Sequence, residues 1–245
     1  MNNLKITSKQ KIYKDKTVRN TNMLPRDQFR SLDDSFKTLV FIDAGFLSKL
    51  SRYFGKGKYL VYDLISFSKN LAEQQNLEVK KIFYYTAPPF QSHNPSTEEK
   101  LRKDKYDRFI RKLSHKNLII REGRCQKIVS GSKIKFSQKG VDTLMTLDLA
   151  SAPLKYPKIK KIILIACDSD FVPVINQIRE FGIKIILYTY FTKRRNTNFS
   201  RSFDLMKSVN EYVKIKQEDF ENAPFNEKLK KKSNAENRKG QLLEK

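Results

Sequence analysis

A short apolar run that ends in two carboxylates constrains the fold of this chain more than any other stretch. Residues 162–166 are apolar without interruption and rich in isoleucine, which is typical of a strand buried on both faces in a parallel sheet. Asp168 and Asp170 follow almost directly, and a helical pattern of apolar residues then runs from Val174 to Gly182. Because open α/β sheets bind their ligands at the carboxyl ends of the strands, these two acids are predicted to lie at a functional edge.

The rest of the chain repeats this alternation of strand and helix. Residues 38–42 form a second apolar run, which ends in Asp43 and is followed by Ala44 and Gly45, a pair that allows a tight turn. Strands that alternate with helices predict a parallel α/β sheet with right-handed crossovers. If the chain winds outward and then reverses, the strands that end at Asp43 and Asp168 become neighbours.

The predicted elements follow from this pattern. The strands are 38–42, 78–86, 117–121, 162–166 and 183–189, and the helices are 46–53, 62–71, 96–113, 139–150, 174–181 and 199–212. Ser96 and Glu99 have the spacing of a capping box, and Pro153 and Pro157 are expected to end the helix before them. Residues 123–137 are predicted to form a hairpin or a loop.

Composition divides the chain into one domain and two basic extensions. Residues 1–35 form a polar extension, residues 36–215 carry the strand and helix patterns, and residues 216–245 read as a flexible basic tail. The chain has 50 basic and 26 acidic residues, a net charge of +24. Such a charge attracts polyanions, chiefly nucleic acid, although a merely solvated lysine-rich surface would carry the same charge. Acids at strand ends in so basic a chain favour an enzyme that acts on nucleic acid.

Few residues support other classes of site. The two cysteines and two histidines predict neither a disulfide framework nor a zinc site built from cysteine, nor a histidine-rich metal centre. The amino terminus lacks an apolar signal region, and no stretch has the length of a membrane span. We therefore expect a cytoplasmic protein without a membrane partner, and a homodimer stays open.

The candidate catalytic and metal-binding residues are four aspartates: Asp43, Asp142, Asp168 and Asp170. Close carboxylates repel one another unless a cation lies between them, and hard divalent cations such as Mg²⁺ prefer oxygen ligands. A metal held in this way can activate water and neutralise charge on a phosphodiester. Asp148 lies about 120° around a regular helix from Asp142, so it is a candidate for a contact that supports the metal ligands. Ser169, between Asp168 and Asp170, is a second candidate for such a contact. Aspartate and serine are also preferred helix caps, and capping is the alternative interpretation of these residues.

At these residues the chain resembles the NYN branch of the PIN-like nuclease superfamily, of the bacterial type. Residues 41–47 (FIDAGFL) are similar to the opening motif FIDGxNL, residues 139–149 to KGVD…DL, residues 166–173 (ACDSDFVP) to SGDSDFxP, and residues 181–184 (FGIK) to GKxV. Together the motifs cover roughly residues 37–215 in the family's order. Phe46 replaces the asparagine of the opening motif and Ala166-Cys167 replaces Ser-Gly, whereas the acids are retained.

The resemblance implies a PIN-like three-layer fold with a central, mostly parallel five-stranded sheet flanked by helices. It also implies ribonuclease activity with Mg²⁺ or Mn²⁺, and it makes the four aspartates metal ligands. We therefore expect a metal-dependent endoribonuclease, with DNA open as a second substrate. Expected phosphate contacts are Lys139, Arg194 and Arg195, for which ordinary surface charge is the alternative.

Two other functions compete with the nuclease. A non-catalytic nucleic-acid-binding module that keeps the PIN-like fold would tolerate the loss of an acid such as Asp168. A phosphatase with an aspartate nucleophile is disfavoured, because haloacid-dehalogenase-type phosphatases carry Asp-x-Asp after the first strand rather than after a later one.

Overall fold

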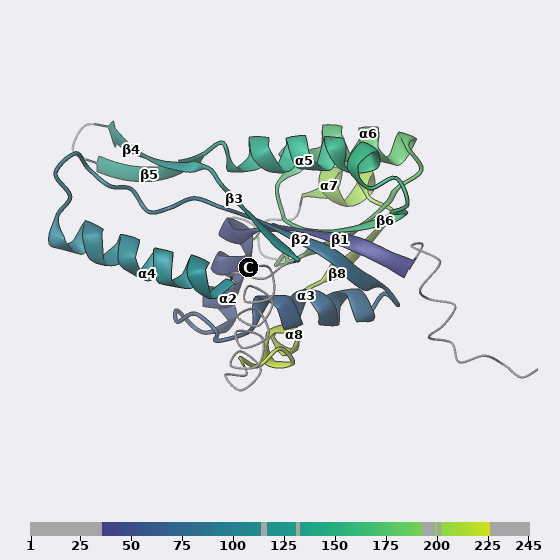
Figure 1. Cartoon of the computed structure of the whole chain (residues 1–245), viewed down its shortest axis with the longest axis horizontal. Helices are drawn as coiled ribbons and strands as arrows, with labels where there is room; N and C mark the ends of the chain where they lie inside the picture. Colours follow the sequence, from purple (N-terminus) through teal and green to yellow (C-terminus); the bar gives the residue numbers. More distant parts are fainter. Residues whose placement is uncertain (1–35, 114–116, 131–132, 193–198, 200–201, 226–245) are drawn as a thin grey trace, which may run out of the picture. The chain divides into compact units, whose positions relative to one another are not determined.

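The computed structural model describes residues 36–113, 117–130, 133–192, 199 and 202–225. Within these residues six strands form one sheet in the order β3-β2-β1-β6-β7-β8, and every neighbouring pair is parallel (Figure 1). The strands are β1 (Lys37–Asp43), β2 (Glu78–Thr86), β3 (Leu118–Glu122), β6 (Lys161–Ile165), β7 (Lys184–Thr189) and β8 (Glu211–Lys214). The predicted α/β class with a flanked parallel sheet is confirmed, with six strands where the sequence predicted five.

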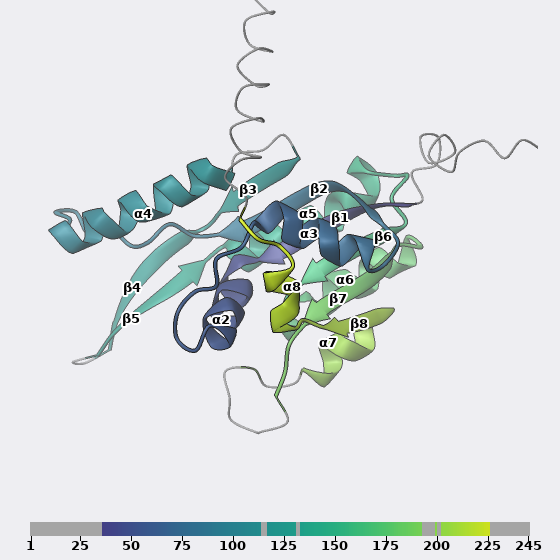
Figure 2. The same cartoon turned by 90° about the horizontal axis from the view of Figure 1, so that it is seen from below.

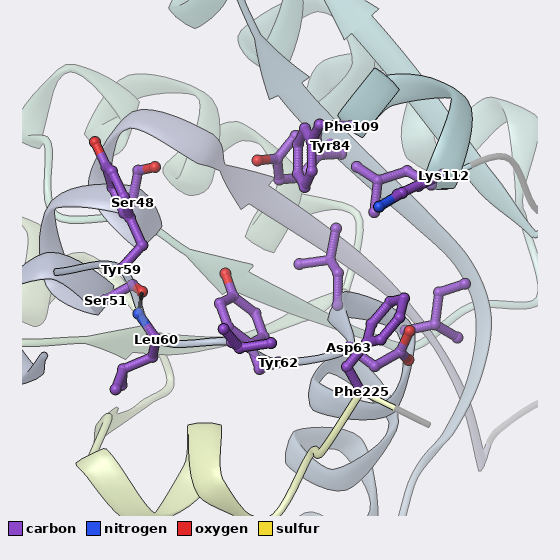
Figure 3. A pocket seen from close by; sticks show the side chains of 14 residues that line it. Ser48, Ser51, Tyr59, Leu60, Tyr62, Asp63, Tyr84, Phe109, Lys112 and Phe225 are labelled. Atoms are coloured by element: carbon purple, nitrogen blue, oxygen red, sulfur yellow. Dashed lines mark hydrogen bonds between the residues drawn. The ribbon is translucent and has the colours of Figure 1, made fainter. Parts of the chain in front are cut away.

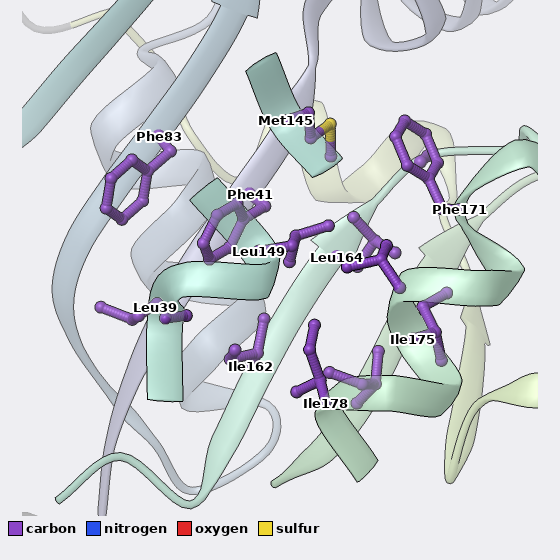
Figure 4. Packing of buried hydrophobic residues seen from close by; sticks show 14 of the residues in the cluster. Leu39, Phe41, Phe83, Met145, Leu149, Ile162, Leu164, Phe171, Ile175 and Ile178 are labelled. Carbon is purple, nitrogen blue, oxygen red and sulfur yellow. The ribbon is translucent and has the colours of Figure 1, made fainter. Parts of the chain in front are cut away.

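Helices cover both faces of this sheet (Figure 1). On one face lie α2 (Ala44–Phe54), α3 (Leu64–Glu73) and α8 (Gln217–Glu221), and on the other lie α5 (Val141–Lys155), α6 (Val172–Glu180) and α7 (Phe203–Ser208). Alternate residues of β1 supply the two cores, because side chains alternate between the faces of a strand. Phe41 belongs to one buried cluster with Leu149 of α5 and Ile175 of α6 (Figure 4), whereas Ile42 belongs to the cluster on the α2 and α3 side. The central strands are therefore buried on both faces, as their apolar runs predicted.

A hairpin and a long helix extend from the same side of the sheet (Figures 1 and 2). The hairpin consists of the antiparallel strands β4 (Arg124–Ser130) and β5 (Lys133–Lys139), which settles the prediction of a hairpin or a loop. The helix is α4 (Thr97–Leu113). Its capping box is confirmed, because Ser96 N donates to Glu99 Oε2 over 3.0 Å and Glu99 N donates to Ser96 Oγ over 3.2 Å. In the described part of the chain, no helix has both the length and the apolar character needed to cross a membrane.

The predicted helix over 199–212 is wrong. Among the described residues of this range, only Phe203–Ser208 is helical (α7), and Glu211–Lys214 forms β8 beside β7. The outer edge of β7 would otherwise leave backbone groups unpaired next to a buried core, at a considerable cost. Asn210 assists the turn into β8, because its Oδ1 accepts a hydrogen bond from Ile185 N over 2.9 Å.

The helix that carries Asp142 ends later than predicted. The sequence placed its end near residue 150, with Pro153 as the stop, whereas α5 continues to Lys155 with Pro153 inside it. Proline forfeits one helical hydrogen bond, but the last turn is held by packing. Ala152 is buried, and Tyr156 packs against the same core and donates its backbone N–H to Ala152 O over 2.9 Å.

The packed body also reaches beyond residue 215, where the sequence placed the start of a tail. Phe220 of α8 is 1% exposed and Ala223 is fully buried, and Phe220 packs edge-on against Tyr62 with 4.9 Å between ring centroids. Residues 226–245 lie outside the described residues. The segment 217–223 thus completes the core on the α2 and α3 side.

Candidate active site

Asp43 stands at the end of β1 and begins α2. Its Oδ1 accepts hydrogen bonds from Gly45 N (2.8 Å) and Phe46 N (3.2 Å), so it satisfies two of the amides that a helix start leaves unpaired. A Cβ on Gly45 would lie 3.1 Å from that Oδ1 and 3.6 Å from Gln138 Oε1. The glycine therefore allows the close approach of the carboxylate and of the hairpin to the start of α2.

Asp168 and Asp170 follow β6, the strand next to β1. The predicted adjacency of the strands is confirmed, because β1 and β6 pair in parallel with Ile42 opposite Ile165. Asp168 caps a short 3₁₀ helix, η2 (Ser169–Phe171), and its Oδ1 accepts from Asp170 N over 3.0 Å. Asp168, Ser169 and Asp170 are all exposed. The capping interpretation thus holds for Asp43 and Asp168, and in both residues Oδ1 accepts the cap hydrogen bonds.

Asp142 joins these acids from the start of α5. The helix begins after Gly140, which has φ +79° and thus adopts a left-handed conformation that glycine tolerates without strain. Asp142 lies in the first helical turn and is exposed. Partial desolvation raises the pKa of Asp142, and the negative charges of Asp168 and Asp170 raise it further. For Asp43, burial is the largest cause of a raised pKa, and the charge of Asp142 adds to it, against the backbone hydrogen bonds that lower it.

These interactions define the acid cluster, by which we mean Asp43, Asp142, Asp168 and Asp170. Three elements supply it: the end of β1, the start of α5 and the turn after β6. Its members interact electrostatically because the carboxyl ends of β1 and β6 and the first turn of α5 meet at one edge of the sheet. The described side chains include no group of three or more histidine, cysteine or acidic residues already arranged to hold a metal ion.

Lys49 lies within electrostatic reach of the acid cluster and was not predicted from the sequence as a site residue. It lies on α2 and is exposed, and its positive charge lowers the pKa of both Asp43 and Asp142. Its position in the sequence could have indicated this, because a residue in the second turn of a helix capped by Asp43 stays close to that cap. Lys49 adds a cation at the edge where the acids gather.

Cys167 lies between the core and the acid cluster. Burial, with the nearby charge of Asp43 as a second cause, raises the pKa of its thiol to about 12. The thiol is therefore neutral at ordinary pH, and a neutral thiol is a poor nucleophile. Cys167 is half-buried and is not a candidate for nucleophilic chemistry.

Asp148 is placed among cations of a different region. Arg121 of β3 binds it with two hydrogen bonds, Nε to Oδ2 (2.8 Å) and Nη2 to Oδ1 (3.0 Å). Tyr85 donates its hydroxyl to Oδ2 over 3.1 Å, and Lys155 Nζ lies 3.5 Å from Oδ1. These contacts tie α5 to β2 and β3. None of these contacts involves the acid cluster, so the supporting role of Asp148 at that cluster stays a prediction.

The expected phosphate contacts are only partly described. Lys139 is exposed at the end of β5, directly before the turn into α5, and thus lies near Asp142 in the chain. Arg194 and Arg195 lie outside the described residues.

Parallel strands with carboxylates at the carboxyl ends of two central neighbours define an α/β protein whose acids lie at the edge where such sheets bind ligands. The model of the NYN domain family matches residues 37–215, and the chain therefore belongs to the NYN domain family. Domains of this family are generally nuclease-like. The predicted family is thus confirmed, over the residues that its motifs covered.

Comparison with individual proteins gives only distant similarities. No curated protein matches. A protein of unknown function from Vibrio parahaemolyticus has 19% identity and a TM-score of 0.48, over 77% of this chain and 97% of that one. The catalytic domain of the CheB methylesterase from Thermotoga maritima has 11% identity and a TM-score of 0.36, over 74% and 93%.

Proposed function

We propose that this NYN domain is a metal-dependent endoribonuclease that hydrolyses RNA phosphodiester bonds at the acid cluster. The observation that carries the proposal is the mutual effect of the carboxylates. Asp142 raises the pKa of Asp43, and Asp168 and Asp170 raise that of Asp142, in a chain with a net charge of +24. Like charges gathered at the ligand-binding edge of a sheet favour a functional site over a structural one.

Mg²⁺ or Mn²⁺ is the proposed cofactor. Carboxylate oxygens suit these hard ions. Burial is the largest cause of the raised pKa values of Asp43 and Asp142, and the neighbouring carboxylates add to it; a divalent cation would offset this repulsion between carboxylates. Three of the four acids are exposed, so their side chains can turn toward an ion. When bound, the ion would activate water and neutralise charge on the phosphodiester.

The chain's own residues divide the remaining work. Asp43 is held by two backbone amides and gives the site a fixed carboxylate. Asp168 and Asp170 close the site from the next strand, and Lys49 and Lys139 bind the phosphate oxygens of the RNA backbone. RNA is the proposed substrate, with DNA as the comparison that tests it.

The direct test is cleavage of labelled single-stranded RNA and DNA by the purified full chain with Mn²⁺, Mg²⁺ or EDTA. Asp43→Asn and Asp168→Asn run alongside, because asparagine also caps helices well and the change thus removes charge with little loss of structure. We expect metal-dependent RNA cleavage that both variants lose. Mn²⁺ binding, measured by electron paramagnetic resonance without RNA, is expected to weaken in the same variants.

Asp107→Asn is the matched control. Asp107 is an exposed acid on α4 that pairs with Lys103, and cleavage by this variant is expected to match wild type. If wild type and all variants are inert with every metal, yet bind RNA with a strong salt dependence, the chain is a non-catalytic binding module. That result would remove the nuclease assignment.

A further inference from the structure

A cavity of about 580 Å³ lies on the α2 and α3 side of the sheet. Its walls come from α2, the segment 59–63, the start of α3, strand β2 and the last turns of α4 (Figure 3). Leu60 N donates to Ser51 Oγ over 2.9 Å, which fixes the segment 59–63 to α2. The volume is within the range of about 300–1,000 Å³ of small-molecule sites.

Aromatic rings are the main recognition groups of this cavity. Tyr59 is 64% exposed and Phe109 is 43% exposed, so both present accessible ring surface. Tyr84 forms part of the inner wall, edge-on to Phe109 with 6.2 Å between ring centroids. Exposed rings on two walls of one cavity suit a flat aromatic ligand that stacks against them.

Tyr84 relates the wall of the cavity to Asp43 of the acid cluster. Tyr84 on β2 is paired with Ile42 of β1, the residue directly before Asp43. The charge of Asp43 also contributes to the raised pKa of the Tyr84 phenol, behind burial as the larger cause, so the two groups are within electrostatic reach. Ser48, which lines the cavity, belongs to the helix that Asp43 caps.

A lysine on the wall of the cavity is suited to contact a phosphate. Lys112 contributes a cation from α4, where the ammonium group is labelled at the wall of the cavity (Figure 3). The one acid among the lining residues, Asp63, uses Oδ1 to accept from Ser66 N over 2.7 Å at the start of α3. Aromatic rings, one lysine and a nearby acid cluster together match a nucleotide that is part of a longer strand.

We propose that this cavity holds the base and ribose of one unpaired nucleotide of the RNA, next to the phosphodiester at the acid cluster. The inference rests on the proposed function and specifies its substrate as single-stranded RNA. A base in a duplex is stacked between its neighbours and must be extruded before it can enter such a pocket. Stacking on aromatic side chains is worth about 1–3 kcal/mol per base in single-strand-binding proteins, so the pocket gives the site its preference for unpaired RNA.

The test measures binding without cleavage. The four nucleoside 5′-monophosphates and ribose 5-phosphate are titrated into the full chain in EDTA and followed by NMR. At least one monophosphate is expected to bind at least tenfold more tightly than ribose 5-phosphate, which lacks the base. Tyr59→Ala and Phe109→Ala should each weaken that binding at least fivefold, a factor that corresponds to the lower end of the stacking range. Tyr212→Ala is the matched control, since Tyr212 is a 44% exposed tyrosine on β8 and is expected to bind like wild type.

Two results would overturn the inference. Equal affinity for ribose 5-phosphate and every monophosphate would show that only a phosphate is bound, and unchanged binding by Tyr59→Ala and Phe109→Ala would show that the base stacks elsewhere. Both results are independent of catalysis. A chain that binds monophosphates through these rings but cleaves no RNA would refute the nuclease and leave the pocket in place, so the two failures are distinguishable.

Discussion

Replacing Asp148 by alanine is expected to destabilise the fold and to leave RNA cleavage at the acid cluster in place. The Asp148 side chain is 9% exposed, and three residues bind it: Arg121 twice, Tyr85 and Lys155. Removing one partner of a fully buried ion pair costs about 3–5 kcal/mol, because the other charge stays buried and unpaired. That full cost does not apply here, since the side chains of Arg121 and Lys155 are 42% and 54% exposed and water can solvate them.

The remaining cost comes from Tyr85. Its side chain is fully buried, and its hydroxyl would lose the acceptor that it has in Asp148. An unsatisfied buried hydroxyl costs about 1–3 kcal/mol, and the lost ion pair adds to it, so we expect Asp148→Ala to lower the free energy of unfolding by about 2–3 kcal/mol. For a domain of this size the midpoint of thermal unfolding falls by about 2–4 °C per kcal/mol.

Urea unfolding followed by circular dichroism measures this difference. Asp107→Ala is the control, because the Asp107–Lys103 pair has a short contact of 2.6 Å but side chains that are 41% and 37% exposed. Exposed pairs of this kind contribute about 0–1 kcal/mol. At a temperature where both proteins are folded, Asp148→Ala should retain metal-dependent cleavage. An Asp148→Ala protein as stable as wild type but inactive would refute this reasoning and place Asp148 in the catalytic site.

Three further changes test the site and its support. Lys49→Gln should lower kcat/KM for RNA about tenfold or more, as expected for the loss of a charged contact to phosphate. Lys58→Gln is the control, since Lys58 is an exposed lysine on the loop after α2. Equal rates for the two variants would exclude Lys49 from the site. Gly45→Ala should lower cleavage roughly tenfold by displacing Asp43, while urea unfolding changes by less than about 1 kcal/mol; unchanged cleavage would show that the carboxylate position is not critical. Phe220→Ala should lower the free energy of unfolding by about 3–5 kcal/mol, and a wild-type urea midpoint would show that α8 does not belong to the core.

Local patterns predicted the centre of the fold well. The apolar runs before Asp43 and Asp168 were typical of buried strands. A chain that winds outward and then reverses would make the two strands neighbours, and the pairing of Ile42 with Ile165 confirms it. The capping box of α4 was also predictable from the sequence, since its two hydrogen bonds join residues three positions apart. Such features depend on residues close in sequence or on rules of chain winding, and both are visible before the structure is known.

Features that depend on distant partners were not readable. Residues 211–214 form a strand because the edge of β7 lies beside them, and their own sequence did not separate a strand from the end of a helix. The pairing of Asp148 with Arg121 joins residues 27 positions apart. Helix geometry alone predicted only the angle between Asp148 and Asp142, which lie on one helix. The electrostatic interaction of Lys49 with Asp142 likewise joins residues that are distant in the sequence.

Capping and catalysis are compatible at the acid cluster because a carboxylate has two oxygens. Asp43 and Asp168 each use Oδ1 to accept backbone amides at the start of a helix, which fixes the side chain in one orientation. A fixed carboxylate loses less conformational entropy when it binds an ion than a side chain that must first be ordered. The same hydrogen bonds lower the pKa of Asp43 against the effect of its burial and so favour the ionised form that a metal requires. The capping role at these two strand ends thus supports the proposed metal site, and asparagine in their place separates the two roles, since it keeps the cap and removes the charge.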